Sequence, residues 1–184
     1  MEHDDGSAGI GSMVGSLFRG GRKLFWVAAV LSLSLDQWTK FAFAIVDPTF
    51  GTHREVIPGA LWFVKQTPNT RGVFGIGPQA PFFYAIAALV GLLLILYFLL
   101  HTPKDRLWPI CALGLIAGGA VGNLVDRLAY GAVRDFIRMI YWPFAYNVAD
   151  AAICIGVAVL MVDVFFAEEE GEGAASEAGQ QAEG

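Results

Sequence analysis

Two aspartates, Asp135 and Asp150, stand fifteen positions apart, and the second lies at the start of a long apolar run. A carboxylate beside a segment of bilayer length is costly, so it is a functional candidate by default. Asn147 lies three residues before Asp150 and shares its helical face. Two carboxylates that meet in a low-dielectric site cannot both ionise easily, and they then titrate as one unit. Such a pair can activate a water and protonate a leaving amine, which is the chemistry of aspartic proteases.

Other polar residues interrupt the apolar runs near the same ends of the predicted helices. Asp36 and Lys40 are four apart on one helix face, and Asn123 shares a face with both Asp126 and Arg127. Each group also has a structural interpretation. The first can be an ion pair within a helix, and the second can be an Asp–Arg pair that caps a helix end. All these polar residues lie near the same ends of the predicted helices, and this common depth in a membrane favours a single site.

Long uncharged segments predict a membrane protein. No Asp, Glu, Lys or Arg occurs in residues 72–100 or in residues 107–125. Two further apolar segments, 24–46 and 146–166, contain only a few polar residues. A helix of about 20 apolar residues crosses roughly 30 Å of hydrocarbon. We therefore expect an all-α membrane protein with four transmembrane helices.

The two ends of the chain differ in composition from the middle. The net charge of the 184 residues is −5, but six glutamates lie in the last 18 residues. Segments rich in Gly, Ala and Glu cannot bury enough apolar surface to fold alone. We predict a disordered cytoplasmic segment at 1–23, a four-span domain at 24–166 and a disordered acidic tail at 167–184.

The loops must position the polar groups. Basic residues precede the first predicted span, which favours cytoplasmic termini. The loop 47–81 then lies outside and contains a short predicted strand, Leu61–Thr67, so we expect a small extracytoplasmic β element between helices one and two. The second outer loop, 127–145, must fold back over the fourth helix for Asp135 to reach Asp150. The outer arginines are expected to pair locally with Asp126 and Asp135.

Three glycines four residues apart in the third predicted span, Gly114, Gly118 and Gly122, predict close approach of another helix. The histidines and cysteines show no ligand spacing, so we expect no metal. A proton-coupled transporter subunit is an alternative function, because acids within spans serve proton relays. A purely structural four-helix protein is another. The inner halves of the spans are almost bare of polar atoms, which disfavours a transporter, and a structural role leaves Asp150 unexplained.

Five short motifs resemble, in order, those of the lipoprotein signal peptidases, the bacterial signal peptidase II family. They are "DQWTK" at 36–40, "NTRGVFG" at 69–75, "GGAVGNLVDR" at 118–127, "VRDF" at 133–136 and "YNVADAAI" at 146–153. The resemblance covers the chain from about Leu24 to Phe166. It departs from the family at Arg71, where the family usually has Gly, and at Tyr146, where the last motif usually begins with Phe.

The resemblance implies an aspartyl endopeptidase of the bacterial inner membrane. Such an enzyme cuts the signal peptide from diacylglyceryl-modified prolipoproteins, just before the lipid-bearing cysteine, and globomycin occupies the same site. The catalytic pair is implied at Asp135 and Asp150. Residues that contact substrate or support the site are implied at five positions: Asp36, Asn69, Asn123, Arg127 and Asn147. The expected partners are lipidated prolipoproteins and membrane lipids. We expect no cofactor, no metal, no nucleic acid, a monomeric state and an active site near the extracytoplasmic face.

Overall fold

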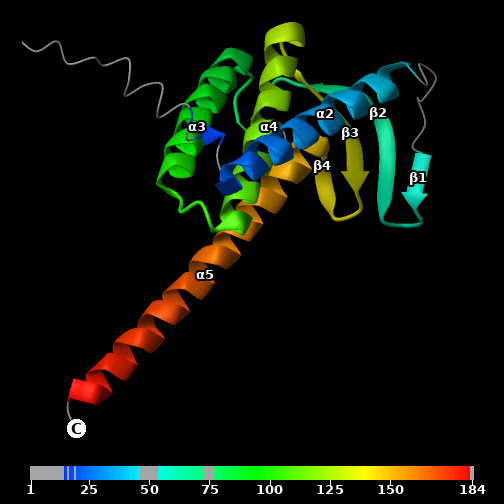
Figure 1. Cartoon of the computed structure of the whole chain (residues 1–184). Coiled ribbons are helices and arrows are strands. Elements are labelled where there is room, and N and C mark those ends of the chain that lie inside the picture. Colours follow the sequence, from blue (N-terminus) through cyan, green and yellow to red (C-terminus); the bar gives the residue numbers. More distant parts are fainter. Residues whose placement is uncertain (1–14, 16, 19, 46–53, 73–76, 183–184) are drawn as a thin grey trace, which may run out of the picture.

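The computed structural model describes residues 15, 17–18, 20–45, 54–72 and 77–182. A helix lies in each of the four ranges expected from the sequence: α2 (Lys23–Ile45), α3 (Pro81–His101), α4 (Leu107–Tyr130) and α5 (Val148–Ala182). A short 3-10 helix, η1 (Gly20–Arg22), precedes α2. The strands are β1 (Arg54–Ile57), β2 (Leu61–Asn69), β3 (Val133–Met139) and β4 (Trp142–Tyr146). Figure 1 shows the sheet beside the helices, near the end of α2 and the start of α5.

Three helices in the described part of the chain are long and apolar enough to cross a membrane. They are α3, α4 and the segment Val148–Phe166 of α5, with mean hydropathies of 2.7, 1.6 and 2.3. Helix α2 is not among them, because Asp36, Gln37 and Lys40 lower its mean hydropathy. The predicted membrane protein with apolar helices is therefore confirmed, but the number of four spans is not.

Helix α4 lies at the centre and packs against the other three long helices. A Cβ atom on Gly114 or Gly118 would collide with backbone oxygens of α2, and one on Gly119 would lie 2.5 Å from the carbonyl oxygen of Ala149 in α5. The predicted close approach of a helix at these small residues is confirmed. A buried apolar cluster fills the end of the bundle away from the sheet: Phe25, Leu99, Ile110, Leu113 and Ala117.

The four strands form one antiparallel sheet in the order β1-β2-β3-β4. The predicted strand Leu61–Thr67 lies within β2, as expected. The predicted β element between the first two helices is confirmed by β1 and β2. The second outer loop, for which no strands were predicted, adds β3 and β4 to the same sheet. In the register of β2 with β3, Thr67 lies opposite Asp135. This pairing carries Asp135 back toward the helices.

The two ends of the chain are described only in part. Helix α5 runs to Ala182 and so covers most of the acidic segment that the sequence predicted to be disordered. Most of the predicted N-terminal segment lies outside the described residues. The proposed domain boundaries stay predictions.

Candidate active site

Asp150 lies in the first turn of α5, where two side chains hold the free backbone N–H groups. Asn147 Oδ1 accepts the N–H of Asp150 at 3.1 Å, and Asp36 Oδ1 accepts the N–H of Ala149 at 3.0 Å. The first N–H groups of a helix have no partner within it, so such caps satisfy them. The Asp150 side chain is thereby placed in the buried mouth of the bundle, and only 6% of the residue is exposed.

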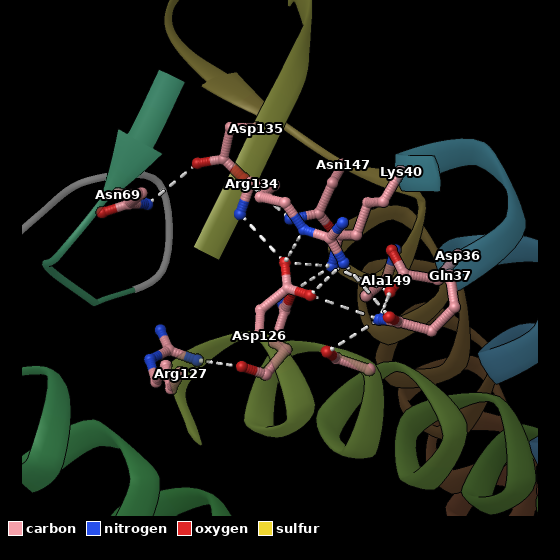
Figure 2. Close-up of polar contacts among 12 residues, drawn as sticks. Asp36, Gln37, Lys40, Asn69, Asp126, Arg127, Arg134, Asp135, Asn147 and Ala149 are labelled. Carbon is pink, nitrogen blue, oxygen red and sulfur yellow. Dashed lines mark hydrogen bonds and ion pairs between the residues drawn. The ribbon is translucent and has the colours of Figure 1, made fainter. Parts of the chain in front are cut away.

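Asp135 lies on β3 and is held by two asparagine amides. Asn69 Nδ2 donates to its Oδ2 at 3.0 Å, and Asn147 Nδ2 donates to its Oδ1 at 2.7 Å; Figure 2 shows the first of these bonds. Burial, and then the charge of Asp150, raise the pKa of Asp135 to about 7, although both amide bonds oppose the shift. Only 2% of Asp135 is exposed. Its carboxyl group can therefore hold a proton near neutral pH.

One residue, Asn147, connects the two aspartates. Its amide donates to Asp135, and its oxygen accepts the backbone N–H of Asp150. The β3–β4 hairpin thus folds back over the start of α5, as the two acids require. The negative charge of Asp150 acts on the carboxyl group of Asp135. The two predicted catalytic residues are brought to one place.

Asn123 and Arg127, one turn apart on α4, face the same place. Asn123 Nδ2 donates to Asp150 Oδ1 at 2.8 Å. The Arg127 guanidinium donates to the backbone oxygens of Asn123 (3.4 Å) and Arg71 (3.2 Å) and lies over the ring of Tyr84. Among the described residues, no carboxylate forms an ion pair with it, and its buried Nε has no hydrogen-bond partner. Arg127 therefore remains able to bind a ligand oxygen.

A cavity of about 200 Å³ lies between α3, α4 and α5 beside these residues. Asp150 lines it, but Asp135 does not and reaches it only through the hydrogen bond from Asn69. The cavity wall combines polar and apolar side chains: Asn69, Gly72, Tyr84, Ala87, Ala88, Ala120, Asn123, Arg127, Val133, Asp150 and Ile153. Such a mixed lining suits a ligand that carries both polar and apolar groups.

A buried cluster of charges supports the site from behind (Figure 2). Lys40 Nζ lies 2.8 Å from Asp36 Oδ2 and 3.1 Å from Asp126 Oδ2, and all three side chains are fully buried. Arg134 binds both oxygens of Asp126, at 2.7 and 3.3 Å. Gln37 bridges Asp36 and Asp126. Buried charges persist only when paired and hydrogen-bonded, and this cluster meets that condition.

The expected pairing of an outer arginine is confirmed for Asp126 and not for Asp135. Asp126 pairs with Arg134, and also with Lys40, whereas its neighbour Arg127 does not bind it, since adjacent residues on a helix do not face each other. Asp135 is held by asparagines and not by an arginine. The sequence analysis assigned no role to Gln37. Gln37 had a usable signal, because it is a polar residue within an apolar span.

The comparisons with known proteins agree with the motifs. A family model described as "Signal peptidase (SPase) II" matches residues 28–166. Proteins called lipoprotein signal peptidase are similar to the chain. The one from Acinetobacter baumannii strain SDF is 37% identical over 80% of this chain and 86% of its own. The one from Polynucleobacter necessarius is 39% identical over 72% and 83%. A solved bacterial membrane enzyme aligns with a TM-score of 0.69 at 30% identity, over 76% of this chain and 85% of its own.

Proposed function

The chain belongs to the signal peptidase II family of membrane proteases, which supports cleavage of signal peptides from prolipoproteins, and we propose that it does so as an aspartic endopeptidase. The substrate is a diacylglyceryl-modified prolipoprotein, cut just before the lipid-bearing cysteine. The observation that carries the mechanism is the pair of buried acids, Asp135 and Asp150, which are joined through Asn147 and of which Asp150 lines a cavity.

The reaction needs one proton shared between the two carboxyl groups. The ionised aspartate takes a proton from a water molecule, and the water oxygen bonds to the carbonyl carbon of the scissile peptide. The protonated aspartate gives its proton to the carbonyl oxygen. When the C–N bond breaks, the nitrogen of the cysteine takes up the proton that came from water and leaves as an amine. The intermediate's hydroxyl then returns its proton, so the pair again shares one.

Five polar residues surround this pair in two roles. Asn69, Asn123 and Arg127 line the cavity and can bind peptide or ester oxygens without adding negative charge. Asp36 and Asn147 instead hold the first turn of α5 and so position Asp150. Asp36 does not line the cavity, which favours a supporting role over contact with substrate.

The lipidated substrate stays in the bilayer, so the enzyme must span the membrane. We include α2 as a fourth span because its charges face inward: Asp36 and Lys40 are fully buried and paired. Its other face carries exposed apolar residues: Val27, Val30, Leu31, Leu35, Trp38 and Phe41. With four spans in the bacterial inner membrane, both termini lie on the same side. The basic residues before the first span favour the cytoplasm for that side, and the site then lies near the extracytoplasmic face. The partners are lipidated prolipoproteins and membrane lipids, with no nucleic acid, and the protein acts as a monomer.

The test uses purified protein in detergent with a lipidated and an unlipidated precursor. Asp135→Asn and Asp150→Asn should each abolish cleavage of the lipidated precursor while the protein remains folded. Asp163→Asn is the matched control, since Asp163 is also on α5 but pairs with Arg106 far from the site. Full activity in Asp135→Asn or Asp150→Asn would remove that residue from the mechanism. Proton flux into liposomes without peptide cleavage would favour a transporter instead.

A further inference from the structure

Three asparagine side chains in the site have fixed orientations. In each, the amide oxygen faces a group that can only donate, and the NH2 group therefore faces a carboxylate. Asn123 Oδ1 accepts from Lys40 Nζ at 3.0 Å, while its Nδ2 donates to Asp150. Asn69 Oδ1 accepts from the backbone N–H of Arg71 at 2.9 Å. Asn147 Oδ1 accepts from the backbone N–H of Asp150. None of the three amides can flip without losing its bond to a donor.

The groups that donate to the three amide oxygens differ in charge. Asn69 and Asn147, which hold Asp135, accept from neutral backbone N–H groups. Asn123, which holds Asp150, accepts from the ammonium group of Lys40. Hydrogen bonds in a chain polarise one another, and a charged donor gives the strongest bond. The chain Lys40–Asn123–Asp150 therefore favours negative charge on Asp150 more than the neutral chains favour it on Asp135.

Taking the proposed aspartic mechanism as its basis, we propose that Lys40, acting through Asn123, makes the catalytic pair unequal. Asp150 is the ionised member that takes the proton from water, and Asp135 is the protonated member that supplies the proton to the carbonyl oxygen. Lys40 is a positioning residue, because it does not line the cavity and is joined to Asp150 through Asn123.

The open oxygen of Asp150 fits this assignment. Asn123 occupies Oδ1, and no hydrogen bond from the part of the chain described here reaches Oδ2. Asp150 lines the cavity, so a water there can give its proton to Oδ2. Both oxygens of Asp135 already accept amide bonds, and Asp135 does not line the cavity. A pKa of about 7 for Asp135, raised in part by the charge of Asp150, agrees with a protonated acid beside an ionised one.

The other charges near the pair do not reverse this asymmetry. Arg127 on α4 interacts with both aspartates and lies against Tyr84 of α3. Asp36 on α2 opposes a negative charge on Asp150, but it is paired with Lys40. The remaining titratable groups that face the pair or its supporting cluster are Cys154 on α5, Asp126 on α4 and Arg134 on β3. Of the cations among them, Lys40 is the one joined to Asp150 by a hydrogen-bond chain.

The experiment measures which carboxyl group holds the proton. Protein labelled with ¹³C at the aspartate carboxyl carbons is titrated by NMR in detergent, and Asp135→Asn and Asp150→Asn assign the two signals. At pH values between the limbs of the activity profile, the Asp150 signal should be that of a carboxylate and the Asp135 signal that of an acid. In Lys40→Met, proton occupancy should move toward Asp150. The acid limb of the pH–rate profile should then move about one unit to higher pH.

Three further variants separate charge from folding. Lys40→Arg keeps the cation and should keep the acid limb near its wild-type position. Asp36→Asn with Lys40→Met removes a buried pair together, so no unpaired Asp36 charge remains to oppose the charge of Asp150. The acid limb should still move to higher pH, but by less than in Lys40→Met alone. Arg134→Met is the matched control. It removes another cation bound to Asp126 but leaves the bond from Lys40 to Asn123, so the acid limb should stay in place.

The results that would overturn the proposal are distinct from those that would overturn the function. A proton found on Asp150 in the wild type, or Lys40→Met profiles and titrations that match the wild type, would refute the role of Lys40 even if the enzyme cleaves its substrate. If a Lys40 variant is inactive at every pH, the NMR titration decides. A wild type that cleaves no lipidated precursor would instead refute the proposed function.

Discussion

Replacement of Asn147 separates the stability of the site from its catalysis. This side chain caps α5 through the N–H of Asp150 and donates an amide bond of 2.7 Å to Asp135. Asn147→Ala removes both contacts. Asn147→Ser keeps a side-chain oxygen that can cap the helix but is too short, and has no amide, to replace the bond to Asp135. The two variants therefore differ in the cap and share the loss of the amide.

The expected changes in stability and in cleavage rate follow from these two contacts. Loss of an N-cap costs about 1 kcal/mol, which corresponds to roughly 2–4 °C in melting temperature for a chain of this length. Loss of a hydrogen bond to a charged or acidic group costs about 1.5–3 kcal/mol, or roughly 10–100-fold in rate if it is needed in the transition state. Asn147→Ala should lose both stability and activity. Asn147→Ser should recover the roughly 1 kcal/mol that the cap contributes and little of the activity.

Thermal unfolding in detergent and the initial rate of cleavage of a lipidated precursor measure the two effects on the same samples. An Asn147→Ser protein with the rate of the wild type would show that the amide bond to Asp135 is not needed. An Asn147→Ala protein that melts at the wild-type temperature would show that the cap does not stabilise α5. Either result would refute the corresponding part of the reasoning.

Two other predictions concern packing and pH. Gly119→Ala should lower stability by about 1–3 kcal/mol and should also lower activity, because a Cβ atom there meets Ala149 beside the site. Gly91→Ala on α3 is the control, since Gly91 has open space around it, and it should leave both unchanged. A mild effect of Gly119→Ala would contradict the close packing. The pKa of Asp135 is raised to about 7, against 3.8 for an ordinary Asp. Protonated Asp135 therefore contributes stability to the fold at low pH, and this contribution is lost as pH rises through 7. The free energy of unfolding of Asp135→Asn, measured relative to that of the wild type, should therefore rise by about 2–3 kcal/mol between pH 5 and pH 8. A difference in unfolding free energy that does not change with pH would show that Asp135 is not buried as an acid.

The acids could be located from the sequence because the free-energy cost of a carboxylate beside an apolar segment depends on residues close to it in the sequence. A carboxylate at the start of an apolar segment is visible without any knowledge of the fold, and this was enough to single out Asp150. Spacing along a helix also correctly paired Asp36 with Lys40, which lie 2.8 Å apart. These features depend only on residues within one or two turns of each other.

The sheet was predicted only in part because its pairing is not local. The strand Leu61–Thr67 alternates and could be recognised alone, whereas β3 has three buried residues among its first four and no simple alternation. Its partner β2 is more than 60 residues away in sequence, and the register that sets Thr67 opposite Asp135 cannot be read from either segment. The two unpredicted strands, β3 and β4, and the wrong partner for Asp135 have this one cause.

The same argument explains why hydropathy alone leaves α2 out of the membrane-spanning helices. A hydropathy average treats Asp36 and Lys40 as two charges facing lipid, although each is fully buried and their ion pair is extended by Asp126 and Arg134. A set of two acids and two bases that neutralise each other can lie at the mouth of a bundle at far lower cost than four separate charges. The polar residues that weaken α2 as a predicted span are thus those that hold α5 and Asn123 in place, and their low hydropathy is a signal of the site and not evidence against the helix.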